Sequence, residues 1–106
     1  MVIVLKQSVQ EMMEIINKEE LIDKLIYELP VLRARLGMTQ DEASDIIGVS
    51  RQTYSSIETR KRNMSWTTYM ALLMVFYNNP ATRSEVENAG LFPEELQQAV
   101  GINHRE

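Results

Sequence analysis

Residues 39–58, TQDEASDIIGVSRQTYSSIE, predict two short helices joined by a tight turn. Thr39 is a good N-cap, and Glu42 follows three residues later, as in a capping box. Gly48 stands where the first helix needs a left-handed residue to end, and Ser50 can cap the second helix. Apolar residues at helical spacing predict the inner faces, namely Ala43, Ile46 and Ile47 in the first helix and Tyr54 and Ile57 in the second.

Two short helices with a glycine in the turn between them form the helix-turn-helix pattern. The stretch resembles the Cro/Xre class of helix-turn-helix DNA-binding domains, and the similarity extends from about Pro30 to Asn78. The residues that carry it are Thr39-Gln40, Glu42-Ala43, Gly48-Val49-Ser50-Arg51 and Ile57-Glu58. The resemblance implies a lambda-repressor-like, five-helix DNA-binding domain, here with additional helices at both ends.

The flanking sequence predicts further helices, so the expected fold class is all-α. Pro30 is expected in the first turn of its helix, where its missing N–H costs nothing. Val31, Leu32 and Leu36 are expected to face the core from that helix. The helix over 65–78 is apolar nearly all round, which predicts a central buried position. The expected helices outside the motif cover residues 8–16, 17–28, 30–37, 65–78, 81–89 and 93–100, with the alternative that the first two form one helix bent at Asn17.

Three parts are expected along the chain. Residues 1–28 form an N-terminal extension, in which residues 1–6 favour either a short strand or a disordered terminus. Residues 29–79 are the helix-turn-helix DNA-binding domain, and residues 80–106 supply C-terminal helices packed on the same domain. The extension is a candidate for dimerisation because it carries an apolar stripe outside the minimal domain, formed by Val9, Met12, Met13, Ile16 and Leu21.

Charge is distributed unevenly along the 106 residues, whose formal net charge is -4. Residues 33–64 carry six Arg or Lys against four Asp or Glu, whereas the segments before and after them are each acidic. An acidic protein is not expected to bind nucleic acid through bulk charge. The basic segment contains the helix-turn-helix pattern, so the acidic flanks are expected to face away from a phosphate backbone or to contact another protein.

Residues suited to catalysis or metal binding are not grouped in this sequence. Cysteine is absent, no glycine-rich phosphate loop is present, and the one histidine, His104, is expected to be solvated in a terminal tail. We therefore expect no enzyme, no metal, no cofactor and no small-molecule ligand. No apolar run approaches a membrane span and no secretory signal is evident, which favours a cytoplasmic protein. Packing is the expected role of Met12, Met13, Trp66, Tyr69, Met70 and Met74.

The resemblance assigns roles to exposed side chains that would otherwise be interpreted as solvated surface. In a helix-turn-helix, the second helix lies in the major groove with its N-terminal residues at base edges. Arg can bond guanine and Gln can bond adenine, and the residues expected at base edges are Arg51, Gln52, Ser55 and Ser56. Contacts with the DNA backbone are expected from Gln40, Ser50, Thr53, Arg60, Lys61, Arg62 and Asn63. The resemblance also implies an ion pair between Arg33 and Glu58.

Two functions from different classes are consistent with this pattern. The first is a bacterial or phage-like transcriptional regulator that binds double-stranded operator DNA as a homodimer. The alternative is an antitoxin-like or other protein-interaction module, in which the acidic flanks bind a partner and DNA contact is secondary. Salt-dependent binding to random DNA distinguishes them, because the regulator requires an affinity that falls steeply with salt.

Overall fold

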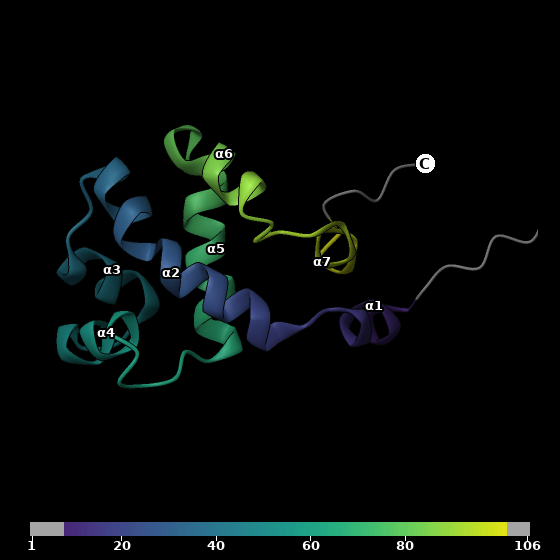
Figure 1. Cartoon of the computed structure of the whole chain (residues 1–106), viewed down its shortest axis with the longest axis horizontal. Helices are drawn as coiled ribbons and strands as arrows, with labels where there is room; N and C mark the ends of the chain where they lie inside the picture. The colour runs from purple at the N-terminus through teal and green to yellow at the C-terminus, as the bar shows by residue number, and fades with distance from the viewer. Residues whose placement is uncertain (1–7, 102–106) are drawn as a thin grey trace, which may run out of the picture. The chain divides into compact units, whose positions relative to one another are not determined.

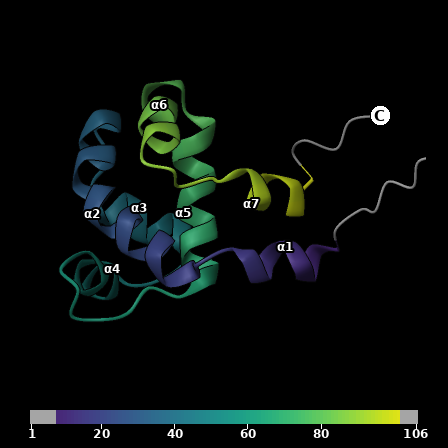
Figure 2. The same cartoon turned by 45° about the vertical axis from the view of Figure 1, so that its right-hand side comes forward.

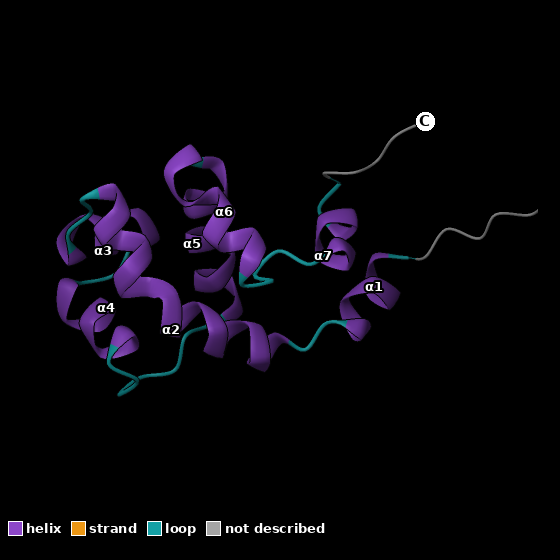
Figure 3. Cartoon of the chain, turned by 45° about the horizontal axis from the view of Figure 1, so that its top comes forward, coloured by secondary structure: helices purple, strands orange, loops and turns teal. Residues whose placement is uncertain are grey.

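The structure is a computed structural model in which residues 8–101 are described, and within this range it contains seven helices and no strand (Figures 1 and 3). The expected all-α fold class is confirmed. The interpretation of residues 1–6 as a strand or disordered terminus, and that of His104, fall outside the described residues. The chain divides into two compact units, one formed by Lys18–Leu91 and the other by the terminal segments up to Asn17 and from Phe92.

Helix α2 (Lys18–Leu36) is continuous, and the expected helix start at Pro30 is wrong. Leu25, Leu29 and Leu32 lie on one stripe that crosses the proline, and all three are fully buried. Proline inside a helix costs about 3 kcal/mol, whereas burying one leucine contributes about 1.5–3 kcal/mol. The buried stripe therefore outweighs the lost hydrogen bond. The expected domain limit between residues 28 and 29 falls inside this helix.

Helices α3 (Gln40–Ile47) and α4 (Arg51–Glu58) form the expected pair with a tight turn between them. The capping box is present: the Glu42 N–H donates to Thr39 Oγ1 at 3.0 Å, and the Thr39 N–H donates to Glu42 Oε1 at 2.9 Å. Gly48 ends α3 with φ 77°, a left-handed conformation that favours glycine. Ser50 caps α4, because its Oγ accepts from the Thr53 N–H at 3.1 Å.

Helix α5 (Trp66–Asn78) is the central helix of this unit and packs against α2, α3 and α6 (Pro80–Asn88), which confirms its predicted place (Figures 1 and 2). Its fully or almost fully buried side chains are Tyr69, Leu72, Leu73 and Phe76. The buried Thr82 hydroxyl donates to the Phe76 carbonyl at 2.7 Å and so ties the start of α6 to α5. The Tyr69 hydroxyl donates to the Leu91 carbonyl.

The second unit pairs α1 (Val9–Ile15) with α7 (Glu94–Ala99). Ser8 and Glu11 form a capping box at the start of α1. Met12 of α1 and Leu96 of α7 are buried. Of the expected C-terminal helices, α6 therefore belongs to the unit that contains α2–α5, whereas α7 belongs with α1.

Some apolar residues expected to pack in the core are exposed instead, namely Val31, Ile46 and Met74. In α3 the buried residues are Ala43 and Ser44, and Ile46 lies about 200° around the helix from Ser44. In α2 the buried stripe passes through Leu32, so Val31 lies about 100° to one side of it. In α2 and α3 the buried face is therefore rotated around the helix axis relative to the predicted one.

Candidate nucleic-acid interface

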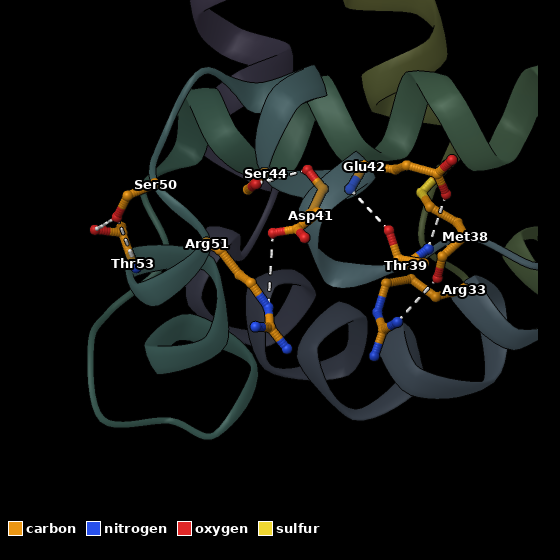
Figure 4. A network of polar contacts seen from close by, with 9 residues as sticks. All are labelled: Arg33, Met38, Thr39, Asp41, Glu42, Ser44, Ser50, Arg51 and Thr53. Atoms are coloured by element: carbon orange, nitrogen blue, oxygen red, sulfur yellow. Dashed lines mark hydrogen bonds and ion pairs between the residues drawn. The ribbon is translucent and has the colours of Figure 1, made fainter.

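Arg33 of α2 and Glu58 of α4 come together in a bidentate ion pair. Arg33 Nε donates to Glu58 Oε1 at 3.0 Å, and Arg33 Nη2 donates to Glu58 Oε2 at 2.8 Å. The remaining Arg33 Nη1 donates to the Met38 carbonyl at 2.9 Å (Figure 4). The side chains are only 16% and 8% exposed, and hydrogen bonding to Glu58 raises the pKa of Arg33 despite the opposing effect of burial. This pair fixes the C-terminal end of α4 against α2.

Tyr54 lies beside this ion pair on the inner face of α4. The Arg33 guanidinium carbon is 5.9 Å from the centroid of the Tyr54 ring. Burial raises the pKa of the Tyr54 hydroxyl, and the neighbouring Glu58 carboxylate adds to the shift. The hydroxyl is buried without a hydrogen-bond partner of acceptable geometry in the described part of the chain. The Tyr54 ring therefore packs in the core of the helix-turn-helix, whereas its hydroxyl contributes little to stability.

The exposed and partly exposed positions of α4 carry the side chains expected at base edges. Arg51 and Gln52 are exposed on its first turn, and Ser55 and Ser56 are partly exposed. Thr53, expected at the DNA backbone, is partly exposed and accepts a hydrogen bond from the Ser50 hydroxyl at 3.1 Å. The structure thus places the expected base-reading residues on one short helix whose other face is held by the core.

Sequence reasoning missed a partner of Arg51. Its Nε lies 3.6 Å from Oδ1 of Asp41, a residue in the first turn of α3 (Figure 4). Gln40, the expected backbone contact, is the residue immediately before Asp41 and is partly buried. The only sequence signal for Asp41 was its position at a helix start, where acidic residues are common for reasons of the helix dipole alone.

The basic loop after α4 contains the remaining residues expected at the DNA backbone. Its turn is closed by two hydrogen bonds to the Ser56 carbonyl, from the N–H of Lys61 at 2.8 Å and from the N–H of Arg62 at 3.1 Å. Lys61, Arg62 and Asn63 have exposed side chains. Lys61 and Arg62 thus place two exposed cations beyond the C-terminal end of α4.

Arg60 differs from its neighbours in this loop. Its φ is 67°, and it is the only non-glycine residue with positive φ among the described residues. Its Nη1 lies 2.6 Å from Asp23 Oδ1 of α2, and its Nη2 donates to the Asp23 carbonyl at 3.3 Å. The Arg60 side chain is therefore directed to α2 and is less free to contact DNA than Lys61 or Arg62.

A shallow groove of ≈ 480 Å³ separates this loop from the first half of α2. Ile22, Ile26 and Met64 supply its apolar lining, and Arg62 and Asn63 supply polar atoms at its edge. No group of three or more His, Cys, Asp or Glu side chains in residues 8–101 lies where it could hold a metal ion.

Comparison with protein families adds an independent finding to this geometry. A family model described as helix-turn-helix matches residues 32–75. Residues 32–75 form a Cro/Xre-type helix-turn-helix domain. The matched segment runs from the end of α2 through α3 and α4 into α5, so it includes the turn and the loop with Lys61 and Arg62. Searches of curated proteins and of solved structures give no match for the chain.

The Cro/Xre-type domain places the chain among DNA-binding regulators in general, with double-stranded DNA as the partner of the domain. The family is a regulatory one and is generally not enzymatic. Among the helices of residues 8–101, none has the length and apolar character needed to cross a membrane.

Proposed function

We propose that this protein is a sequence-specific transcriptional regulator that binds operator DNA through α4, as a homodimer. One observation carries the proposal: the first turn of α4 presents Arg51 and Gln52 to solvent, while Glu58 at its other end is fixed by Arg33. A recognition helix needs exposed side chains at one end and a fixed attachment to the core, because the side chains that meet base edges must be presented by a rigid element.

Backbone contacts are proposed for the polar groups that surround α4. Lys61 and Arg62 lie in the loop that follows it, and Gln40 opens α3 on the other side of the turn. Cations that meet phosphates position the protein and add affinity without sequence preference. Arg60 is a weaker member of this set, because Asp23 already pairs with its guanidinium.

Dimerisation is proposed through the unit formed by α1 and α7. These helices have seven and six residues, which is too short for stable isolated helices. Val9, Ile15 and Val100 leave apolar surface exposed on this unit. A second copy would cover that surface, and a dimer that binds a palindromic site must present two copies of α4 about 34 Å apart, one turn of DNA.

The test is selection of bound sequences from a randomised pool of duplex DNA by the full chain. A regulator of this kind enriches a palindromic site, and its affinity for that site falls steeply as salt rises. Absence of any enriched sequence, together with binding that is weak and insensitive to salt, would refute the proposal. Sedimentation at micromolar concentration tests the dimer, and a monomer that still selects a palindrome would refute the dimer alone.

Two substitutions sharpen the assignment of α4. Arg51→Ala is expected to weaken binding to the selected site and to leave binding to random DNA nearly unchanged, because it removes a base contact. Arg83→Ala removes the same charge from α6, which lies away from α4 (Figures 1 and 2), and serves as the matched control. Equal effects of the two substitutions would exclude Arg51 as a base-reading residue.

A protein-interaction module is the second candidate. The supporting observation is the outer face of α2, where Tyr27 is 77% exposed and Val31 is 49% exposed one turn later. Exposed apolar side chains at this spacing suit a helical partner. In this case Tyr27→Ser would abolish capture of the partner and leave DNA selection intact, whereas loss of DNA selection in the same variant would argue against it.

A further inference from the structure

The contact between Asp41 and Arg51 joins the two helices of the motif at the edge of the DNA-facing surface. Asp41 Oδ1 lies 3.6 Å from Arg51 Nε, and the two side chains are 71% and 66% exposed. Asp41 is one residue beyond Gln40, and Arg51 is the first residue of α4. Although acidic residues are common in the first turn of a helix, this carboxylate lies where phosphates are proposed to approach and would repel them.

The atom of Arg51 that faces Asp41 determines what the rest of the guanidinium can do. Arginine has five N–H donors, one on Nε and four on the two terminal nitrogens. Asp41 faces Nε, and Figure 4 shows the terminal nitrogens on the side away from the carboxylate. These two nitrogens have no hydrogen-bond or ion-pair partner among residues 8–101. Guanine presents two acceptors, O6 and N7, on its major-groove edge.

We propose that Asp41 is a positioning residue that holds Arg51 by Nε, so that the two terminal nitrogens are directed end-on to the O6 and N7 of one guanine. The proposal rests on the proposed function, in which Arg51 reads a base. It adds a specificity determinant outside the recognition helix, on the neighbouring helix α3.

Arg51 gains from such a partner because its side chain is long and exposed. Fixing a free arginine in one conformation when it meets a base costs conformational entropy. A side chain that Asp41 already biases toward one conformation loses less freedom at that step. The pair is weak in the free protein, because both side chains are exposed to water. It becomes stronger when the DNA groove excludes water from it, because the local dielectric falls.

The same carboxylate disfavours DNA on which Arg51 finds no guanine. On such sequences Asp41 remains near the phosphates, and its repulsion is not offset by a base contact. Asp41 is therefore expected to lower random-DNA affinity while it raises preference for guanine at one position. This combination separates a positioning role from a simple charge effect, which would change both affinities by the same factor.

The experiment compares Asp41→Asn with Asp45→Asn in the full chain, using the randomised duplex pool. Asp45 is an exposed acid one turn later on α3 and forms no ion pair within the described residues, so it controls for the loss of charge. Asp41→Asn is expected to reduce guanine preference at the position read by Arg51 by roughly fivefold, given the worth of one bidentate contact. It is expected to raise random-DNA affinity, and Asp45→Asn should leave the guanine preference unchanged.

Two further variants complete the test. Asp41→Glu retains the carboxylate one methylene further out and is expected to restore part of the guanine preference. Arg51→Ala identifies the position that Arg51 reads, because preference is lost there. If Asp41→Asn and Asp45→Asn raise all affinities alike, the positioning role is refuted while the proposed function stands. If Arg51→Ala changes no base preference, the base-reading assignment in the proposed function is refuted, and the inference with it.

Discussion

Removing one partner of the Arg33–Glu58 pair tests the interaction that holds α4 in place. Glu58→Gln keeps the shape of the side chain but replaces one carboxylate oxygen with an NH2 group. Since Arg33 donates to both oxygens, at 3.0 and 2.8 Å, the new NH2 group faces a donor. The guanidinium loses its counter-charge while its side chain remains only 16% exposed.

The expected loss can be placed between two limits. An exposed ion pair contributes less than about 1 kcal/mol, whereas removing one partner of a buried pair costs about 3–5 kcal/mol. The side chains of Arg33 and Glu58 lie near the buried limit, but Arg33 keeps its hydrogen bond to the Met38 carbonyl. We expect Glu58→Gln to lower the free energy of unfolding by about 3 kcal/mol. The midpoint of thermal unfolding should fall by roughly 12 °C for a chain of this size.

Urea unfolding followed by Trp66 fluorescence measures this loss. Trp66 is the one tryptophan in the sequence and lies at the start of α5, where its ring stacks on that of Tyr69 with 4.7 Å between the ring centroids. Glu20→Gln serves as the control, since Glu20 pairs with Lys24 at 3.5 Å across an exposed turn of α2. That control should cost less than about 0.5 kcal/mol. A loss below about 1 kcal/mol for Glu58→Gln would show that the pair behaves as an exposed one, and the reasoning would be wrong.

Substitutions at four other positions have defined outcomes. Tyr54→Phe should change the free energy of unfolding by less than about 1 kcal/mol, because the buried hydroxyl has no hydrogen-bond partner of acceptable geometry among residues 8–101; a larger loss in urea unfolding would reveal a hydrogen bond. Arg60→Gly should be more stable than Arg60→Ala by about 1 kcal/mol, because only glycine adopts the φ of 67° without strain; equal stability would exclude strain at this turn. Lys61→Ala should weaken binding to selected and random DNA alike and reduce the slope of log affinity against log salt by about 1. Gln40→Ala should also weaken both but leave that slope nearly unchanged, since glutamine is neutral, and a change of slope would contradict the backbone assignment.

Short sequence patterns predict a structural feature correctly when that feature depends only on residues close by in the chain. The capping box of Thr39 and Glu42 and the left-handed Gly48 were predicted because each depends on backbone within a few positions. Pro30 was misinterpreted for the complementary reason. Its local preference favours a helix start, whereas the buried stripe that passes through Leu29 and Leu32 is a property of the packed unit.

In the candidate site too, some features are predictable from the sequence and others are not. The surface of α4 was predictable, because residue type and family pattern together mark Arg51 and Gln52. The contact of Arg51 with Asp41 was not, because it depends on the angle at which the turn sets α4 against α3. The direction of the Arg60 side chain was missed as well, since its partner Asp23 lies 37 residues earlier in the chain.

The separation of packed and exposed side chains on α4 bears on how the sequence of this protein can evolve. Two residues of α4, Tyr54 and Ile57, are buried in the core, and Glu58 pairs with Arg33. Substitutions at these positions are expected to destabilise the fold. Arg51 and Gln52 face solvent, and surface substitutions away from such features usually change stability by no more than about 0.5 kcal/mol. Under the proposed function, mutations of Arg51 and Gln52 can therefore change the preferred DNA sequence without first compromising folding. The same separation makes the first turn of α4 the natural place to randomise when a new DNA preference is to be engineered.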